Sequence, residues 1–486
     1  MRKLIQLIAL GALSTAFFGC TTYTQQSAKI TEAWNAGDGA LAASLISNKV
    51  EKVEGRKDEL IWNLEYGTIL QTIGKIEQSQ AVFDHAEDII NKYEEEAKLS
   101  ATKEAGALLT NQANLPYRGR SYDKIMVNTY KALNYMLLGE HDKARVELNR
   151  SLQRQKDAVE ENSRRIAKMQ EEAEKAKNTP DEKEAEAEEN TEDEVADYDV
   201  DRALEDPKFS AAVEEQMTQL DERLLPYASY VNPFAVFLDG LFFSYHATSS
   251  SDYERARKSL ERVKGMSPGK YISEDYAMVE RLEAGSSTNS TTYILFMTGS
   301  APSRDQIRID IPLFLVTGEI SYVGAAFPRL EYHDDFIPSI STTNSAGEVL
   351  TSELLCDMDA VISRDFKDDW PVVLTKTLLT SATKALAAYA IEQAAEESGN
   401  IWVKIGTKVA TVGYQAGTNI SDTRTWQTLP KQISYIRMPS PSDGKINLMV
   451  GSRNVPVEVS PGKNNIVTIR SVNSRSAPIV DTFCVN

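Results

Sequence analysis

Histidine and cysteine are scarce in this chain. Its 486 residues include three cysteines and four histidines, and the histidines lie far apart at His85, His141, His246 and His333. Metal sites and nucleophilic triads need such side chains on converging elements at defined spacings. The chain also has no G-x-S-x-G elbow, P-loop, dinucleotide fingerprint or H-E-x-x-H motif. We therefore expect no catalytic residue, no metal ligand and no cofactor.

An excess of positive charge is missing as well. The chain has 53 Lys and Arg against 71 Asp and Glu, which gives a net charge of −18. Nucleic-acid binding needs basic patches, so this class of partner is excluded. Residues 181–206 include fourteen acidic residues and only two basic ones, Lys183 and Arg202. Blocks of like charge are usually solvated, so we expect a mobile loop over about residues 178–201.

The apolar run near the N-terminus, residues 4–18, is shorter than a membrane-spanning helix, which needs about 20 apolar residues. It follows Arg2 and Lys3 and ends at Gly19-Cys20. A basic start, a short apolar stretch and a small residue before the cleavage point predict a secretory signal over residues 1–19. One possibility is an ordinary signal peptide in which Cys20 has no special role.

Gly19-Cys20 resembles the bacterial lipobox, in which the cysteine is acylated, for example with palmitate, and becomes the mature N-terminus. The resemblance implies that the lipid bilayer is a partner through acylated Cys20. The residue after the cysteine is Thr21 rather than Asp, which is similar to an outer-membrane sorting signal. We therefore expect a lipid-anchored protein of the cell envelope, on the outer membrane and facing the periplasm.

Glycine, alanine and aromatic residues recur in the first half of the chain at the spacing of the tetratricopeptide repeat. One copy contains Gly67, Leu70 and Phe83, and further copies surround Gly139 and Gly240. Glycine allows two antiparallel helices to approach, and the large side chains fill the space between them. We expect a tetratricopeptide-like helical array over residues 20–285, with a generic helical bundle as the alternative.

Two runs with heptad spacing, residues 148–176 and 209–224, flank the acidic stretch. They predict an antiparallel, coiled-coil-like helical hairpin inserted at residues 150–226, with the acidic loop at its tip. Several core positions of the first run are polar, which weakens a free-standing coiled coil. One charged helix followed by a linker is the alternative.

From residue 286 the sequence favours strands. Segments 291–300, 306–316 and 319–332 are rich in β-branched and aromatic residues. Pro371 is typical of the first turn of a helix, and residues 403–414 predict a second helix. Short strand-like segments after Trp426 predict a small β-sandwich. The fold class is therefore multidomain, α then α+β, with residues 286–486 forming a β-rich domain that contains two helices.

Five aspartates cluster between residues 357 and 369: Asp357, Asp359, Asp365, Asp368 and Asp369. Paired carboxylates can act as general acid and base. Acidic side chains also stabilise the beginning of a helix, and this cluster precedes the helix expected at Pro371. We favour the second interpretation.

Cys356 and Cys484 remain once Cys20 is assigned to acylation. Disulfides persist in an oxidising compartment, so we expect a disulfide between them, with two buried free thiols as the alternative.

Several further strings are unusually specific, among them residues 230–240, 322–332, 358–366 and 421–430. Together with the lipobox they resemble an uncharacterised family of Gram-negative envelope lipoproteins with a tetratricopeptide-like N-terminal half. This resemblance implies an architecture and a location but no activity. In the last string, Asp422 and Arg424 are expected to form an internal ion pair or a contact with a partner.

Repeat arrays of this kind present a concave surface to peptides and proteins. We therefore expect a non-enzymatic, lipid-anchored envelope scaffold or assembly factor that binds other envelope proteins through its helical array. The alternative is a cell-wall or envelope-modifying enzyme, or a regulator of one, with its site in the C-terminal α+β domain.

Overall fold

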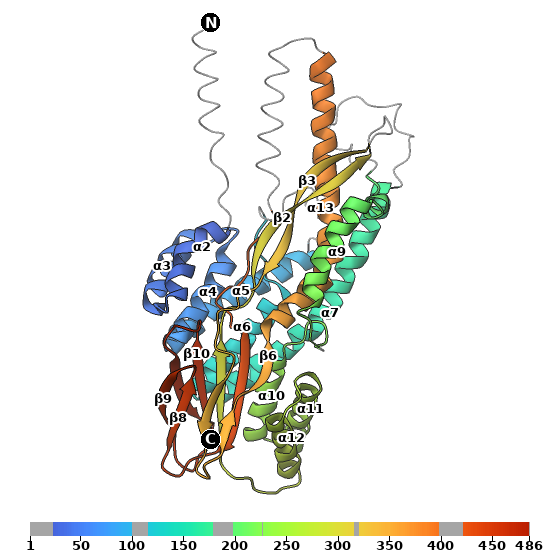
Figure 1. The fold of residues 1–486 in the computed structure, drawn as a ribbon. Helices are drawn as coiled ribbons and strands as arrows, with labels where there is room; N and C mark the ends of the chain where they lie inside the picture. Colours follow the sequence, from blue (N-terminus) through green and yellow to red (C-terminus); the bar gives the residue numbers. More distant parts are fainter. Residues whose placement is uncertain are drawn as a thin grey trace.

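The computed structural model describes residues 23–99, 115–177, 198–225, 227–314, 320–397 and 421–485. A helical N-terminal half is followed by a strand-rich region that contains one long helix, so the fold is mixed α+β (Figure 1). Cys20, residues 178–197 of the acidic stretch and the helix expected at residues 403–414 lie outside the described residues.

The helical half is a series of antiparallel helix pairs joined by short turns. Its helices are α2 (Tyr23–Asn35), α3 (Gly39–Val53), α4 (Glu59–Thr72), α5 (Ile76–Leu99), α6 (Ser121–Leu137), α7 (His141–Lys177), α8 (Val200–Leu204), α9 (Pro207–Asp221), α10 (Pro233–Tyr245), α11 (Ser250–Met266) and α12 (Lys270–Glu283). Gly74 and Gly139 occupy the turns α4–α5 and α6–α7 with φ angles of 76° and 71°. Glycine adopts this backbone region without steric cost.

Close approach within a pair depends on a glycine in its first helix. A Cβ atom at Gly67 of α4 would lie 2.5 Å from the Phe83 ring of α5, and one at Gly240 of α10 would lie 2.8 Å from Leu260 of α11. No real Cβ contact is that short. In both pairs a glycine of the first helix therefore packs against a large side chain of the second, as the repeat pattern predicts.

The strands form two sheets and a separate hairpin. One sheet has the order β11-β10-β1-β7-β6, the other has the order β5-β4-β8-β9, and β2 pairs with β3 alone. Their bounds are β1 (Thr291–Thr298), β2 (Ser303–Phe314), β3 (Ile320–Glu331), β4 (Ile340–Thr343), β5 (Val349–Thr351), β6 (Glu353–Asp357), β7 (Gln432–Pro439), β8 (Lys445–Val450), β9 (Arg453–Glu458), β10 (Asn465–Ser471) and β11 (Ile479–Cys484).

The strands after Trp426 do not form a sandwich of their own, so that prediction is wrong. β7, β10 and β11 belong to one sheet, whereas β8 and β9 belong to the other. Each sheet is completed by strands that precede the long helix. The central strand is β1, which is buried along its whole length and pairs in parallel with β10 and antiparallel with β7.

The long helix is α13 (Met358–Glu397), and it begins thirteen residues before Pro371. The carboxylate of Asp357 accepts a hydrogen bond from the N–H of Ala360 at 3.1 Å, which is the bond of an N-cap residue. Pro371 lies inside the helix, where it removes one intrahelical hydrogen bond. The prediction that Pro371 opens the helix, with the acidic cluster before it, is therefore wrong.

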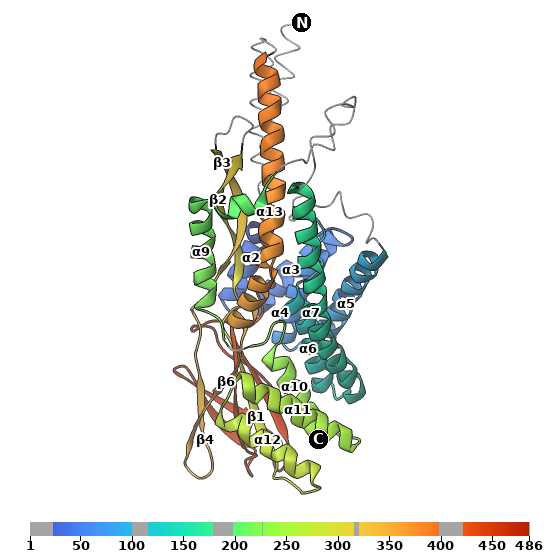
Figure 2. The ribbon, with the colours of Figure 1, turned by 90° about the vertical axis from the view of Figure 1, so that its right-hand side faces the viewer.

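The expected hairpin of two paired arms is also corrected. One side of the expected hairpin is α7, and the other is α8 with α9. The helix α13 lies between α7 and α9 and packs on both (Figure 2). Polar residues of the α7 seam bond to the backbone of other segments. Gln155 accepts from the N–H of Asn232 at 3.3 Å, and Asn162 donates to the carbonyl of Asp368 at 3.1 Å.

Two hydrophobic cores result. The first runs without interruption from α2 through the helix pairs into both sheets. The second joins α8, α9, the β2–β3 hairpin and α13, and extends with α13 beyond the body as an arm (Figures 1 and 2). Along the described parts of the chain, no helix is long and apolar enough to cross a membrane.

Gly67→Ala tests the close approach of α4 and α5. The added methyl group would collide with Phe83, so we expect a loss of about 1–3 kcal/mol in the free energy of unfolding, measured by urea denaturation. Gly265→Ala in α11 is the matched control, because nothing lies within 4 Å of its Cβ position and alanine favours a helix by about 0.5–1 kcal/mol. Equal effects of the two changes would contradict the packing described.

Candidate functional site

The first helices of consecutive pairs, α2, α4 and α6, share a face that is covered by another part of the same chain. Residues 421–428, which precede β7, contact this face through five side chains, which we call the array face: Thr31, Glu65, Thr68, Tyr122 and Tyr130. Nearly every residue of α4 and α6 is buried in consequence. The array face is thus covered by a segment of the same chain.

Trp426 is the centre of this contact. Its side chain is fully buried, and its indole N–H donates to the hydroxyl of Thr68 at 2.9 Å. The ring centroids of Phe83 and Tyr130 each lie 5.8 Å from that of Trp426, a separation typical of favourable aromatic pairs. Trp426 therefore acts as the hydrophobic anchor of the segment.

Glu65 holds the backbone of the same segment. Its carboxylate accepts hydrogen bonds from the N–H groups of Gln427 at 2.7 Å and Thr428 at 3.0 Å, and from the hydroxyl of Tyr23 at 3.0 Å. Burial raises the pKa of Glu65 to about 7, although these donors oppose the shift. The carboxylate is thus the acceptor for both of these backbone amides.

Arg424 forms the ion pair expected with Asp422. Its Nε lies 2.8 Å from the Asp422 carboxylate, and one Nη atom lies 3.0 Å from Asp58 and 2.8 Å from the carbonyl of Leu115. The opposite charges of Asp422 and Asp58 raise the pKa of Arg424 against the effect of burial. The side chain is nearly inaccessible, so this pair is internal and ties the segment to the array.

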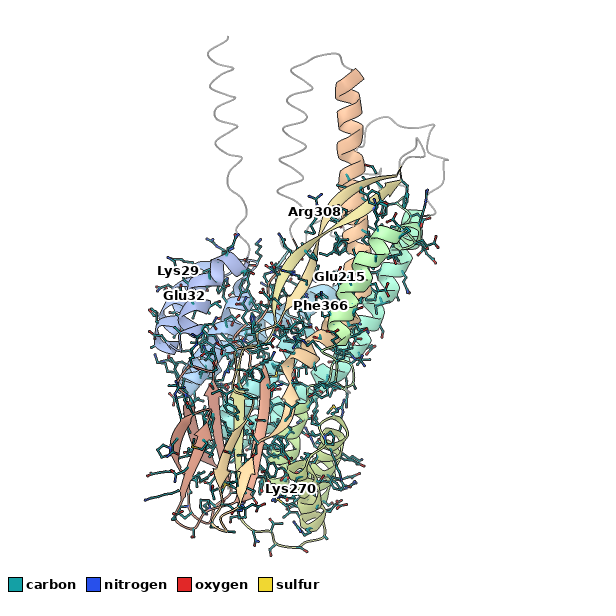
Figure 3. The ribbon with its side chains drawn as sticks, viewed as in Figure 1. Lys29, Glu32, Glu215, Lys270, Arg308 and Phe366 are labelled. Atoms are coloured by element: carbon teal, nitrogen blue, oxygen red, sulfur yellow. The ribbon has the colours of Figure 1, made fainter. Side chains whose placement is uncertain are left out.

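A second group of buried charges surrounds the start of the arm. Arg304 on β2 and Asp365 and Asp369 on α13 are all at least nine-tenths buried. Asp369 accepts from Arg165 of α7 at 3.0 Å. Arg304 lies over the ring of Phe366, 4.8 Å from its centroid, where α13 leaves the body (Figure 3). These charges join α7, α13 and β2.

Asp365 differs from its neighbours in having no direct partner. Neither of its carboxylate oxygens has a hydrogen-bond partner among the described residues, and the same is true of Nε and one Nη of Arg304. Burial, followed by the nearby charge of Asp369, raises the pKa of Asp365 well above its ordinary value. Burial also lowers the pKa of Arg304. Burial without a partner favours the neutral form of a carboxyl group.

The remaining aspartates of the predicted cluster have separate roles. Asp357 caps α13, and Asp359 is paired with Lys431 just before β7. The five carboxylates therefore do not converge on one open site. Likewise, no group of three potential metal ligands comes together in the part of the chain that the structure describes.

The expected disulfide is not formed, and both cysteines are free thiols. Cys356 lies on β6 and Cys484 on β11, which are the two opposite edges of the five-stranded sheet. Four strand spacings of about 4.8 Å separate these edges, whereas a disulfide needs Cα atoms within about 7 Å. Burial raises the pKa of the Cys356 thiol.

Sequence reasoning found the pair of Asp422 and Arg424. It missed Asp58, which also binds Arg424, and Glu65, which accepts from the backbone of residues 427 and 428. Glu65 is the only charged residue among residues 60–70, and a lone acid in a largely apolar helix is a signal for an internal partner. The identity of that partner, more than 350 residues away, has no local signal.

The sequence matches no family model and no curated protein. A solved structure described as a tetratricopeptide repeat protein from Parabacteroides merdae is similar over 53% of this chain and 98% of its own, with 12% identity and a TM-score of 0.14. At that TM-score the likeness carries no argument about a site.

Asp365→Asn should change how stability depends on pH. The folded-state pKa of Asp365 is raised, so its contribution to stability is fully present below the unfolded pKa of about 3.9 and is lost as pH rises through the folded pKa. We expect the variant to gain at least about 1 kcal/mol at pH 8 and much less at pH 4.5, measured by denaturant unfolding.

Asp369→Asn is the matched control, because it removes the negative charge that pairs with Arg165 and should destabilise the protein at pH 8. A loss of stability in Asp365→Asn at pH 8 that equals the loss in Asp369→Asn would contradict the described burial of an unpaired carboxyl.

The two thiols should react very differently. Cys484 is exposed and Cys356 is buried, so a thiol reagent should modify Cys484 in the native protein and Cys356 only after unfolding. Mass spectrometry of the labelled peptides measures this. A reductant should leave the melting temperature unchanged, and a lowered melting temperature would show that a disulfide exists after all.

Proposed function

We propose that this protein is a non-enzymatic, lipid-anchored scaffold or assembly factor of the cell envelope, built on a tetratricopeptide-like array. The proposal is supported by three features: the lipobox-like Gly19-Cys20, the series of helix pairs with glycine at their contacts, and the internal partners of the charged side chains. The observation that carries it is the arm, an extension with its own hydrophobic core, beside an array whose face is covered by residues 421–428.

The short distance between the anchor and the fold supports a scaffold role. Tyr23 is the first residue of α2, and its ring packs 4.9 Å from that of Trp62 while its hydroxyl bonds to Glu65. Cys20 precedes it by three residues, which span at most about 10 Å. An acylated Cys20 would therefore hold the array itself at the bilayer rather than on a long tether.

The partner surface that we propose is the arm rather than the array face. The array face is covered by residues 421–428, whereas the arm exposes large apolar side chains. Val159 on α7 is 47% exposed, and Leu204 on α8 and Tyr322 on β3 are each 38% exposed. Isolated apolar side chains are common on surfaces, and Val349 on β5 is more exposed than any of these three. The three are chosen for their place on α7, α8 and β3, which contribute to the arm.

Photo-crosslinking in intact cells tests this proposal. A photoreactive amino acid placed at Val159 or Tyr322 should capture one or a few envelope proteins. Val349 on β5, which is 66% exposed on the sheet, is the control position and should capture none of them. Capture from Val349 alone, or from no position on the arm, would contradict an arm-mediated scaffold.

The alternative function, a cell-wall or envelope-modifying enzyme or its regulator, would use the carboxylates of α13. The unpartnered oxygens of Asp365 favour this alternative, but the side chain is only 3% exposed. Asp365→Asn with an intact fold separates the two functions. If the protein is a scaffold, the variant should form the same crosslinks and support the same cell phenotype as the unchanged protein. A variant that forms the same crosslinks but no longer supports that phenotype would favour the enzyme.

The anchor is tested by Cys20→Ala. We expect this change to abolish incorporation of labelled palmitate, to leave the precursor uncleaved and to remove the protein from washed membranes that were stripped with salt. The unchanged chain is the control. Labelling that persists in Cys20→Ala would contradict acylation at this residue.

A further inference from the structure

A cavity of about 30 Å³ lies between the five-stranded sheet and the C-terminal halves of α4 and α6. On the sheet side it is lined by Arg470 of β10 and by a cross-strand pair, Thr468 of β10 opposite Asp481 of β11. On the helix side it is lined by Thr72 of α4 and Tyr130 of α6. One water molecule needs about 10–15 Å³ of such space, so the cavity has room for a small polar group.

Arg470 brings a buried positive charge to this cavity. The residue is 6% exposed, and its two Nη atoms donate to the carbonyls of Met297, Thr428 and Ser471 at 2.8 to 3.4 Å. In the described parts of the chain, no carboxylate pairs with Arg470, and its Nε has no hydrogen-bond partner. Carbonyl groups do not neutralise a guanidinium, and a buried charge without a counter-ion is costly. The cavity is therefore suited to an anionic group.

The hydroxyl group of Tyr130 is also without a partner. The residue is only 2% exposed, and its hydroxyl makes no hydrogen bond to any residue that the structure describes. Burial raises the pKa of Tyr130, and the charge of Arg470 has the opposite effect, so the two groups lie close together. A hydroxyl that is buried without a hydrogen bond costs free energy. Tyr130 and Arg470 can thus donate to the same anionic group.

Asp481 brings a carboxylate to the rim of the cavity. Its side chain is partly exposed, and one of its oxygens lies 3.9 Å from the place of a Cβ atom on Gly74, in the turn between α4 and α5. Burial alone raises the pKa of Asp481, with no charge or donor of the described residues acting against it. Asp481 and Arg470 thus line one cavity without pairing with each other.

We propose that this cavity binds a small zwitterion, a molecule with one carboxylate and one ammonium group. The carboxylate of the ligand would pair with Arg470 and accept from the hydroxyl of Tyr130, and the ammonium group would donate to Asp481. Such a ligand supplies an opposite charge to each of the two unpaired side chains. Leu133 and Ile479 also line the cavity, which suits a short methylene chain between the two charged groups.

A bound zwitterion would strengthen the contact between the sheet and the helices. It would join β10 and β11 to α6, and Arg470 already donates to the carbonyl of Thr428 in the segment that covers the array face. A ligand that binds only the folded state raises stability in proportion to the logarithm of its concentration above Kd. The site uses neither Cys20 nor the arm, so it stands apart from the proposed scaffold function.

Isothermal titration calorimetry tests the site on the chain from residue 20 onward, with Cys20→Ala to prevent acylation. The ligands are glycine, β-alanine and γ-aminobutyrate, together with propionate and propylamine, which carry only one of the two charges. We expect at least one of the three zwitterions to bind at least about tenfold more tightly than either single-charge compound, because each adds a hydrogen bond between charged groups. No binding of any ligand, or equal binding of the zwitterions and a single-charge compound, would overturn the proposal.

Two variants locate the binding. Asp481→Asn removes the partner of the ammonium group from a partly exposed position, and Tyr130→Phe removes one hydroxyl but keeps the ring that packs on Phe83 and Trp426. Each should weaken binding of the zwitterion about tenfold at an unchanged melting temperature. The matched control is Asp88→Asn, an exposed acid of α5 outside the cavity, which should change binding by less than about threefold.

Unchanged affinity in both Asp481→Asn and Tyr130→Phe would overturn the assignment of the cavity as the binding site. An equal loss of affinity in Asp88→Asn would overturn it as well, because that change leaves the cavity intact. Neither result depends on palmitate labelling or on crosslinks from the arm, so failure of this site and failure of the scaffold are distinguished.

Discussion

The bonds from Glu65 to the N–H groups of Gln427 and Thr428 join segments that are 362 and 363 residues apart in the chain. Trp426 fills the adjacent space between Phe83 and Tyr130. Residues 421–428 lead directly into β7, and β7 pairs with the central strand β1. The position of this segment therefore sets how the sheet meets the helix pairs, and the single core that spans both depends on it.

This arrangement changes where a scaffold can bind. In an open repeat array the inner surface receives a partner peptide, but here a segment of the chain itself occupies that position. Displacing it would expose Trp426 and leave the carboxylate of Glu65 without its backbone donors, at a cost comparable to losing a core aromatic and several hydrogen bonds. The partners of the proposed scaffold would therefore bind the arm, whose core is separate from this contact.

Local signals in the sequence predicted the helix pairs and most of the strands. Turn glycines such as Gly74 and the contact glycine Gly67 mark their positions without reference to distant residues. Seven strands, β1 to β3 and β7 to β10, lie where β-branched residues alternate between turns. The strands β4, β5, β6 and β11 were missed. β4 and β5 have only four and three residues, too few for an alternating pattern to stand out.

The errors concern contacts between distant residues. The parallel pairing of β1 with β10 connects residues more than 170 positions apart, and no local pattern shows that it would place strands from before and after the long helix in one sheet. The disulfide was inferred from the compartment alone, which says nothing about sheet edges. The sequence does not show which residue of the acidic run caps the helix, so Pro371 was taken as the helix start. The N-cap bond from Asp357 to Ala360 places the start thirteen residues earlier.

Hydrogen exchange of the Gln427 and Thr428 amides tests whether Glu65 holds residues 421–428 as part of the core. If Glu65 holds this segment as part of the core, the two amides should exchange as slowly as those of β1, with the same dependence on denaturant, because one cooperative opening exposes them all. Exchange that is orders of magnitude faster, while α4 and β1 stay protected, would contradict the account and show that the inner face of the array opens on its own.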